Sequence, residues 1–268
     1  MKQKKLSTVI LSFAVFAIFS SCQKQPEADF TMNKTEAFTG DTILFTNTTI
    51  NGDHYKWDFG DGANSTDDSP SHIYTKAGEY NIVLTAYSEK DKKTSKREQS
   101  IKTEKANEIE YNGNKYPVSK AYVDIWGDHN GTYDYYHFSV SLVSEGVTFT
   151  EDDVLGIGNV IMGSLWSPSP TSIVPGIYTF ADNYAAMSYN FGLTGLNYDV
   201  ANDIGTSFEC TGGSISVAQE DTEYIFDFNY TLATGKIVKA HFKGTLLFYD
   251  HTDKQFLNTN KFRILSKK

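Results

Sequence analysis

A predicted β-hairpin near residues 120–140 carries the side chains of this chain that are best suited to binding chemistry. Asn130-Gly131 is the dipeptide preferred in two-residue type I′ turns. That turn places Trp126 opposite Tyr135 and Asp124 opposite His137 on one face. A flat aromatic surface edged by carboxylate and imidazole suits a sugar, because apolar C–H faces stack on rings while polar groups bond hydroxyls. The alternative is that a second sheet or loop covers this face.

The same register makes the other face of the hairpin apolar. It pairs Ala121 with Val140, Val123 with Phe138, and Ile125 with Tyr136. Trp166, at the end of a predicted strand over 158–166, is expected to join the site from a neighbouring element, with Tyr184 or Tyr189 as alternatives. The candidate ligand-binding residues are therefore Tyr122, Asp124, Trp126, Tyr133, Tyr135, His137 and Trp166.

No motif in the chain predicts catalysis. The patterns of zinc proteases, serine hydrolases, phosphate-binding loops and dinucleotide sites are all missing from the sequence. The six histidines have no metal-ligand spacing, so no cofactor and no metal are expected. Two carboxylates distant in sequence would suffice for glycoside cleavage, which keeps a glycoside-active enzyme as the weakest alternative.

The N-terminus has the form of an export signal. Lys2, Lys4 and Lys5 precede an apolar run over 6–20, which is short for a transmembrane helix. Phe19-Ser20-Ser21-Cys22 then resembles a bacterial lipobox. This resemblance implies cleavage after Ser21, lipidation of Cys22 and anchoring to the membrane. Gln23 in place of Asp favours the outer membrane, with the surface and periplasmic faces both open.

The charge of the chain excludes nucleic acid as a partner. The formal net charge is -9. Residues 1–21 contain three lysines and no acidic residue, so their removal leaves 21 basic and 33 acidic residues and a net charge of -12. A polyanion is repelled by such a protein. Only 2 cysteines are present, and lipidation of Cys22 leaves Cys210 without a disulfide partner.

Short alternating strands separated by Gly, Asp and Ser clusters predict an antiparallel sandwich over 27–103. Trp57-Asp58-Phe59-Gly60-Asp61-Gly62, with Ser71-His72-Ile73-Tyr74 and Ala77-Gly78-Glu79-Tyr80, resembles the PKD domain. The resemblance covers the whole segment and implies an Ig-like, extracellular, non-catalytic module. Trp57 is expected to lie between the sheets. Asp58 and Asp61 are expected to accept backbone N–H bonds at the Gly60 and Gly62 turns, with calcium binding as the alternative.

A second antiparallel β-domain, a sandwich or barrel, is predicted over 109–268. Asn112-Gly113 predicts a hairpin that pairs Ile109 with Tyr116 and Glu110 with Lys115. Strands are also expected near 213–217, 222–232, 236–248 and 261–265, and loops over 184–198. The segments 213–217, 234–236 and 242–246 are similar to C-terminal β-domains of envelope lipoproteins, which implies no activity.

The sequence therefore predicts an all-β, non-catalytic lipoprotein of the cell envelope. Its parts are a signal peptide (1–21), a tether (22–26), a PKD spacer (27–103), a linker (104–108) and a β-domain (109–268). The partners expected are the membrane, through the anchor, and a glycan. The alternative is a structural or adhesive lipoprotein that recognises an envelope protein through a broader apolar patch.

Overall fold

The computed structural model describes residues 24–128, 134–149, 154–181 and 185–252, and every regular element in these ranges is a β-strand. The all-β class predicted from the sequence is confirmed. Within the described ranges, no helix is long and apolar enough to cross a bilayer. The chain divides into two compact units, Met1–Glu104 and Lys105–Lys268.

The first unit contains eight strands in its described part. They are β1 (Phe30–Met32), β2 (Glu36–Phe38), β3 (Thr42–Asn47), β4 (His54–Asp58), β5 (Asn64–Ser65), β6 (Ser71–Ile73), β7 (Gly78–Tyr87) and β8 (Thr94–Glu104). One sheet has the order β1-β3-β6 and the other the order β2-β8-β7-β4-β5. Alternation along β7 buries Ile82, Leu84 and Ala86 on one face. The buried faces of the two sheets pack together in one core, so the unit is the predicted β-sandwich.

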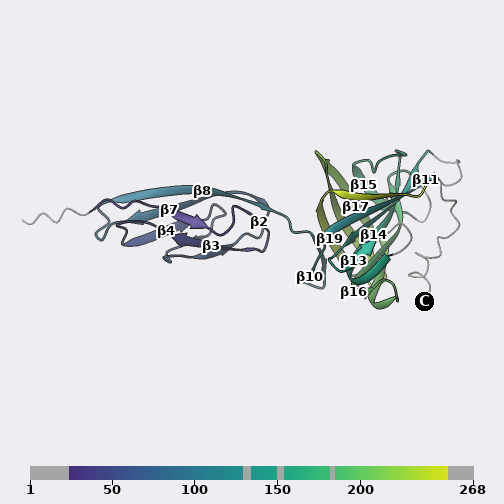
Figure 1. Ribbon diagram of the computed structural model, residues 1–268, viewed down its shortest axis with the longest axis horizontal. Coiled ribbons are helices and arrows are strands. Elements are labelled where there is room, and N and C mark those ends of the chain that lie inside the picture. Colours follow the sequence, from purple (N-terminus) through teal and green to yellow (C-terminus); the bar gives the residue numbers. More distant parts are fainter. Residues whose placement is uncertain (1–23, 129–133, 150–153, 182–184, 253–268) are drawn as a thin grey trace, which may run out of the picture. The chain divides into compact units, whose positions relative to one another are not determined.

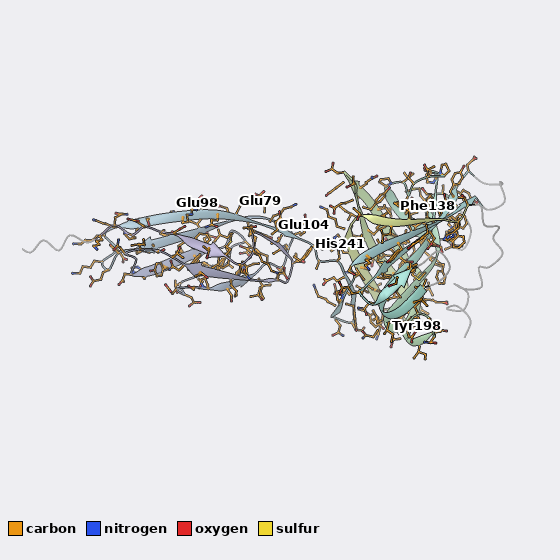
Figure 2. All side chains as sticks on the ribbon, viewed as in Figure 1. Glu79, Glu98, Glu104, Phe138, Tyr198 and His241 are labelled. Atoms are coloured by element: carbon orange, nitrogen blue, oxygen red, sulfur yellow. The ribbon has the colours of Figure 1, made fainter. Side chains whose placement is uncertain are left out.

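The longest strand of the first unit is β8, which runs along it (Figure 1). It has 11 residues, which at about 3.3 Å per residue is about 36 Å. Its first residue, Thr94, accepts a hydrogen bond from Gln25 Nε2 (2.6 Å), and its last is Glu104 (Figure 2). The start and the end of this unit are therefore separated by the length of one strand.

The second unit is built from twelve described strands. They are β9 (Glu108–Tyr111), β10 (Asn114–Pro117), β11 (Lys120–Asp128), β12 (Tyr136–Val143), β13 (Val147–Phe149), β14 (Val154–Ser167), β15 (Gly176–Phe180), β16 (Ser188–Asp199), β17 (Ile204–Glu220), β18 (Glu223–Leu232), β19 (Ile237–Gly244) and β20 (Leu246–Asp250). Their order in the sheet is β10-β9-β19-β18-β17-β15-β16-β14-β12-β11-β20, with β13 paired to β14.

This sheet curls around one core. Strands β11 and β19 are not hydrogen-bonded neighbours, yet they come into contact. The interior holds Phe138 of β12 (Figure 2) together with the buried face of β18, which includes Phe226, Phe228 and Tyr230. The unit is a half-closed, barrel-like sheet, as the sequence predicted.

The first hairpin of this unit has the predicted register. Ile109 pairs with Tyr116 and Glu110 with Lys115. Asn112 and Gly113 have φ values of 52° and 76°, as a type I′ turn requires. The Lys115 ammonium binds the neighbouring carboxylate of Glu108, at 2.6 Å.

Three expectations for this unit were wrong. Residues 188–199 form strand β16 rather than a loop. Glycine is needed at position 192 of this strand, because a Cβ there would collide with the side chains of Cys210 and Tyr230. The strand predicted over 236–248 ends at Gly244, after which β20 pairs in parallel with β11 and leaves Phe248 half exposed. A second parallel pair, β15 with β16, departs from a purely antiparallel sheet. The strand expected at 261–265 lies outside the described residues.

Candidate functional site

The hairpin formed by β11 and β12 has the predicted faces but a different register. Ala121 pairs with Leu142, Val123 with Val140 and Ile125 with Phe138, two residues away from the predicted partners. Because side chains alternate with a period of two, a shift of two keeps each side chain on its face. Ala121, Val123 and Ile125 therefore still face the core.

The predicted register fails because the connection is longer than two residues. The ladder ends at Asp128 and Tyr136, and residues 129–133, Tyr133 among them, lie outside the described residues. The register also shifts between Ile125 and Gly127, which leaves Trp126 in a β-bulge. Consequently Asp124 lies opposite Ser139 rather than His137, and the predicted Trp126–Tyr135 pair is absent from the described ladder.

Four rings form a row on the outer face of this sheet. They are His251, which follows β20, Trp126 of β11, His137 of β12 and Trp166 of β14. The centroid distances along the row are 4.5, 6.5 and 4.7 Å, and the interplanar angles are 21–22°. The sequence predicted that Trp166 would join this face, and His137 pairs with it directly across the ladder. We call these four residues the ring row.

Exposure differs along the ring row. Trp166 and His251 are only 3% and 5% exposed, whereas Trp126 and His137 are half-buried. Tyr135 is also half-buried and meets Trp166 edge-on, at 85°. The expectation of a coplanar, exposed Trp126–Tyr135 surface is therefore wrong. Because Trp166 and His251 are buried, the accessible part of the site is formed by Trp126, Tyr135 and His137.

Two further predicted residues lie beneath the surface. Tyr122 is 3% exposed, and its ring stacks on Phe149 at 4.6 Å and on Tyr249 at 6.0 Å. It belongs to a small apolar cluster on the outer face, where it packs rather than contacts solvent. Tyr189, the alternative contributor, is buried on the opposite face against Tyr230. Tyr184 lies outside the described residues.

Asp124 lies next to the ring row and is 5% exposed. Its Oδ1 bonds to His251 Nε2 at 2.9 Å. Burial raises the pKa of the Asp124 carboxyl, and the hydrogen bond from His251 opposes this rise only in part. Because His251 also stacks on Trp126, the Asp124–His251 pair fixes the position of one face of that indole.

Sequence reasoning missed two residues of this site. His251 reaches Asp124 because β20 pairs in parallel with the edge of β11. No local sequence pattern predicts that a strand so distant in sequence pairs with β11. Asn190 is half-buried, and its Oδ1 accepts a hydrogen bond from Trp166 Nε1 (3.2 Å). The ladder shifts register at this point of β16, so alternation alone does not assign Asn190 to this face.

The Trp57–Gly62 motif builds the core and one turn of the first unit. Trp57 is fully buried between the two sheets, with Phe30 at 5.1 Å and Phe45 at 5.5 Å. Its Nε1 donates to the carbonyl of Asp67 (3.0 Å). The predicted anchoring role of Trp57 is confirmed.

The two aspartates of the motif accept backbone N–H bonds, as predicted. Asp58 Oδ1 accepts from Gly60 and Asp61 Oδ1 from Ala63, both at 3.0 Å. Gly60 and Gly62 have φ values of 81° and 95°, and a Cβ on Gly60 would lie 2.7 Å from the Asn81 carbonyl oxygen. Both glycines are required by this turn.

His72 completes the turn from β6. Its Nε2 lies 2.8 Å from Asp61 Oδ2, and its ring stacks on Phe59 at 4.3 Å. The motif aspartates thus bind backbone and His72, and the described residues contain no group of three side chains that could hold a metal ion.

Comparison with protein families agrees with this geometry. The family model of the PKD domain matches residues 23–103. Residues 23–103 form a PKD domain. The match begins a few residues before the predicted boundary at 27, in the segment that Gln25 attaches to β8.

The curated relatives are similar to this chain over the PKD domain. The pre-pro-metalloprotease PrtV of Vibrio cholerae is 32% identical over 91 residues, which are 32% of this chain and 10% of that protein. Collagenase ColQ1 of Bacillus cereus is 31% identical over 90 residues, which are 30% of this chain and 9% of the collagenase. The chain thus spans about a tenth of the length of these relatives.

Solved structures also show likenesses to parts of this chain. The PKD1 domain of Vibrio cholerae PrtV is 33% identical and aligns 30% of this chain with 99% of its own (TM-score 0.27). A structure titled for carbohydrate-binding modules of the β-sandwich superfamily is 16% identical and aligns 82% of this chain with 91% of its own (TM-score 0.32). At these TM-scores neither structure indicates a function for this chain.

Acid is expected to weaken the PKD domain through Asp61. Burial raises the pKa of this carboxyl, but the hydrogen bonds from His72 and the Ala63 N–H outweigh burial and lower it overall. A depressed pKa stabilises the fold above the unfolded value of about 3.9, and the contribution disappears as the pH falls through the folded pKa. We expect Asp61→Asn to cost about 1 kcal/mol at pH 7 and much less at pH 2.

Hydrogen exchange of the β4 and β7 amides measures this effect in the PKD domain alone. Glu89→Gln, at an exposed position, is the matched control and should change the exchange rates at neither pH. An Asp61→Asn cost that is equally large at both pH values would contradict a role for the ionised carboxylate.

Proposed function

We propose that this chain is a non-catalytic, lipid-anchored envelope protein whose C-terminal β-domain binds a glycan. In this proposal Cys22 carries the anchor at the outer membrane, and the PKD domain is a spacer. The spacer role is supported by β8, which starts beside Gln25 and ends at Glu104 about 36 Å away.

The observation that carries the glycan proposal is the cluster of Trp126, Tyr135 and His137 on the outer face of β11 and β12. All three are half-buried, and buried rings of Trp166 and His251 support them. Aromatic rings contact the apolar face of a sugar, and the Asn190 amide can bond its hydroxyls. A rigid support lowers the entropy cost of such binding.

A protein partner is the second candidate. Ile157 and Ile204 are 61% and 65% exposed. Ile157 of β14 and Ile204 of β17 both pair with Asp199 of β16, so the two isoleucines lie on either side of Asp199. Leu155, also exposed, lies on the same strand as Ile157. This apolar group, at the ends of β14, β16 and β17, suits the centre of a protein interface better than a sugar.

A glycan array incubated with the chain starting at Gln23 tests the proposal. Binding to a defined class of polysaccharide, lost in Trp126→Ala and retained in Ile157→Ser, supports the glycan site. No binding to any glycan, together with a partner protein that copurifies with the wild type and is lost from Ile157→Ser, would replace it with the protein candidate.

A further inference from the structure

One end of the PKD domain carries a concentration of positive charge. Residues 89–97, which connect β7 to β8 and begin β8, contain five basic and two acidic residues. The rest of segment 27–103 contains four basic and eleven acidic residues. We call residues 89–97 together with Lys56 the basic tip. Glu27, Asp29 and Asp53 reach the same end of the domain, so the excess of positive charge belongs to segment 89–97 itself.

Several cations of the basic tip are available to a ligand. Arg97 binds Asp29 through Nε (3.2 Å), and Asp91, one of the two acidic residues, is engaged by His54 Nε2 (2.7 Å). A further set of tip lysines is exposed and has no carboxylate partner among the described residues. They are Lys56, Lys90, Lys92 and Lys96.

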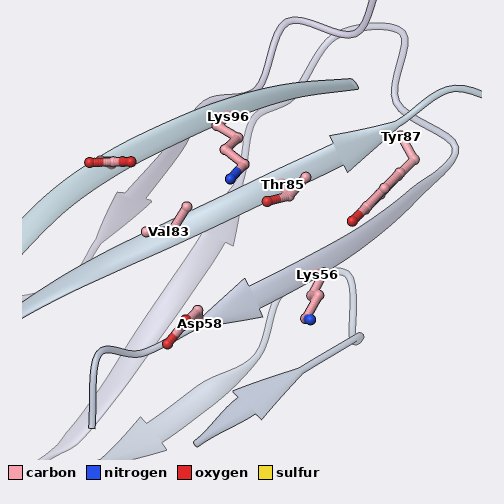
Figure 3. Close-up of a pocket in the computed structure, with 7 residues that line it drawn as sticks. Lys56, Asp58, Val83, Thr85, Tyr87 and Lys96 are labelled. Atoms are coloured by element: carbon pink, nitrogen blue, oxygen red, sulfur yellow. The ribbon is translucent and has the colours of Figure 1, made fainter. Parts of the chain in front are cut away.

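Two of these lysines border a shallow hollow on the outer face of β4, β7 and β8. Lys56 and Lys96 are both paired with Thr85 and extend on either side of it (Figure 3). The hollow, of about 270 Å³, is also lined by Tyr87. The carboxylates of Asp58 and Glu98 line the other part of the hollow, beside Val83, and accept hydrogen bonds from Gly60 N–H and Asn81 Nδ2. Two ammonium groups that flank a hydroxyl form a favourable place for a phosphate oxygen.

The basic tip is also the end of the domain at which the chain enters. Gln25 Nε2 donates to the Thr94 carbonyl, and the Ala28 N–H donates to Ser95 Oγ (2.7 Å). Cys22 precedes Gln25 by three residues, which span at most about 10 Å of chain. That distance is about one Debye length at physiological ionic strength.

We propose that the basic tip binds the anionic headgroups of the membrane that holds the anchor. The proposal rests on the proposed lipidation of Cys22, which would keep the tip at the surface. Polybasic segments are attracted to anionic lipids when they lie within a Debye length. Glu36 and Glu79, which both pair with Lys102, lie near the far end of β8, where salt screens their repulsion. Anchor and tip together make two contacts with the membrane, and these restrict the direction in which β8 leaves the surface.

Vesicle binding without the anchor tests this proposal separately from lipidation. The chain starting at Gln23 contains every described residue and is mixed with vesicles of phosphatidylethanolamine and phosphatidylglycerol (3:1). We expect cosedimentation at low salt, loss of binding in 0.5 M NaCl, and none to phosphatidylcholine vesicles. The triple variant Lys90→Gln/Lys92→Gln/Lys96→Gln should bind roughly 100-fold more weakly.

The matched control removes three exposed lysines elsewhere, with Lys76→Gln, Lys120→Gln and Lys239→Gln. It has the same net charge as the tip variant and should bind like the wild type. Equal losses in the two triple variants, or equal binding of wild type to phosphatidylcholine, would overturn the proposal. Far-UV circular dichroism confirms that both variants fold. Failure here would leave the lipid anchor and the glycan site untouched, because the assay uses neither.

Discussion

Replacing Trp126 with alanine is expected to weaken glycan binding about 30-fold, which corresponds to about 2 kcal/mol. The indole is half-buried, has His251 stacked on it at 4.5 Å, and lies 6.5 Å from His137. Its removal deletes the largest accessible ring of the site and releases the imidazole that holds Asp124. Isothermal titration with the polysaccharide that binds best on the array measures the loss.

Two variants separate binding from folding. Trp126→Phe keeps a ring against His251 and should retain most of the affinity. Tyr116→Ala removes a half-buried aromatic residue from β10, away from the ring row, and should bind like the wild type. If Trp126→Ala folds and binds the glycan as tightly as the wild type, the ring row is not the site.

Replacing Cys22 with serine is expected to abolish incorporation of radioactive palmitate and to remove the protein from the detergent phase in Triton X-114 partition. Acyl chains contribute about 0.8 kcal/mol per buried CH₂, so loss of several chains removes almost all of the anchoring energy. The effect should be complete rather than graded.

Cys210→Ser is the matched control, because the chain contains only 2 cysteines. Cys210 is 8% exposed, and burial raises the pKa of its thiol to about 11, so it is a poor nucleophile. This variant should keep the label. Palmitate that remains on Cys22→Ser and disappears from Cys210→Ser would contradict the lipobox interpretation.

Local patterns predicted those parts of the fold that are determined by neighbouring residues. The Asn112-Gly113 hairpin has its predicted register because two residues with positive φ close a two-residue turn. The Trp57 motif was recognised by its resemblance to the PKD domain, and its residues act locally, in the core or at the turn. The alternating face of β18 was recognised for the same reason.

The parts that failed depend on distant segments. The register of β11 with β12 was wrong because the connection is longer than the Asn130-Gly131 turn implies and because Trp126 lies in a bulge. Strand β16 was taken for a loop because the need for glycine at position 192 depends on the distant residues Cys210 and Tyr230. For the candidate site, the sequence predicted the face and most of its residues. It did not predict which of these residues are buried, nor that His251 forms a hydrogen bond with Asp124.

The most direct test of the central claim is the indole spectrum of the chain. The protein has three tryptophans, Trp57, Trp126 and Trp166, so ¹H–¹⁵N correlation gives three side-chain N–H signals. They can be assigned by Trp→Phe substitution. Titration with the glycan identified on the array should shift the Trp126 signal most, the Trp166 signal less, and the Trp57 signal, from the PKD core, not at all. A glycan that binds while the Trp126 signal stays in place would contradict the account.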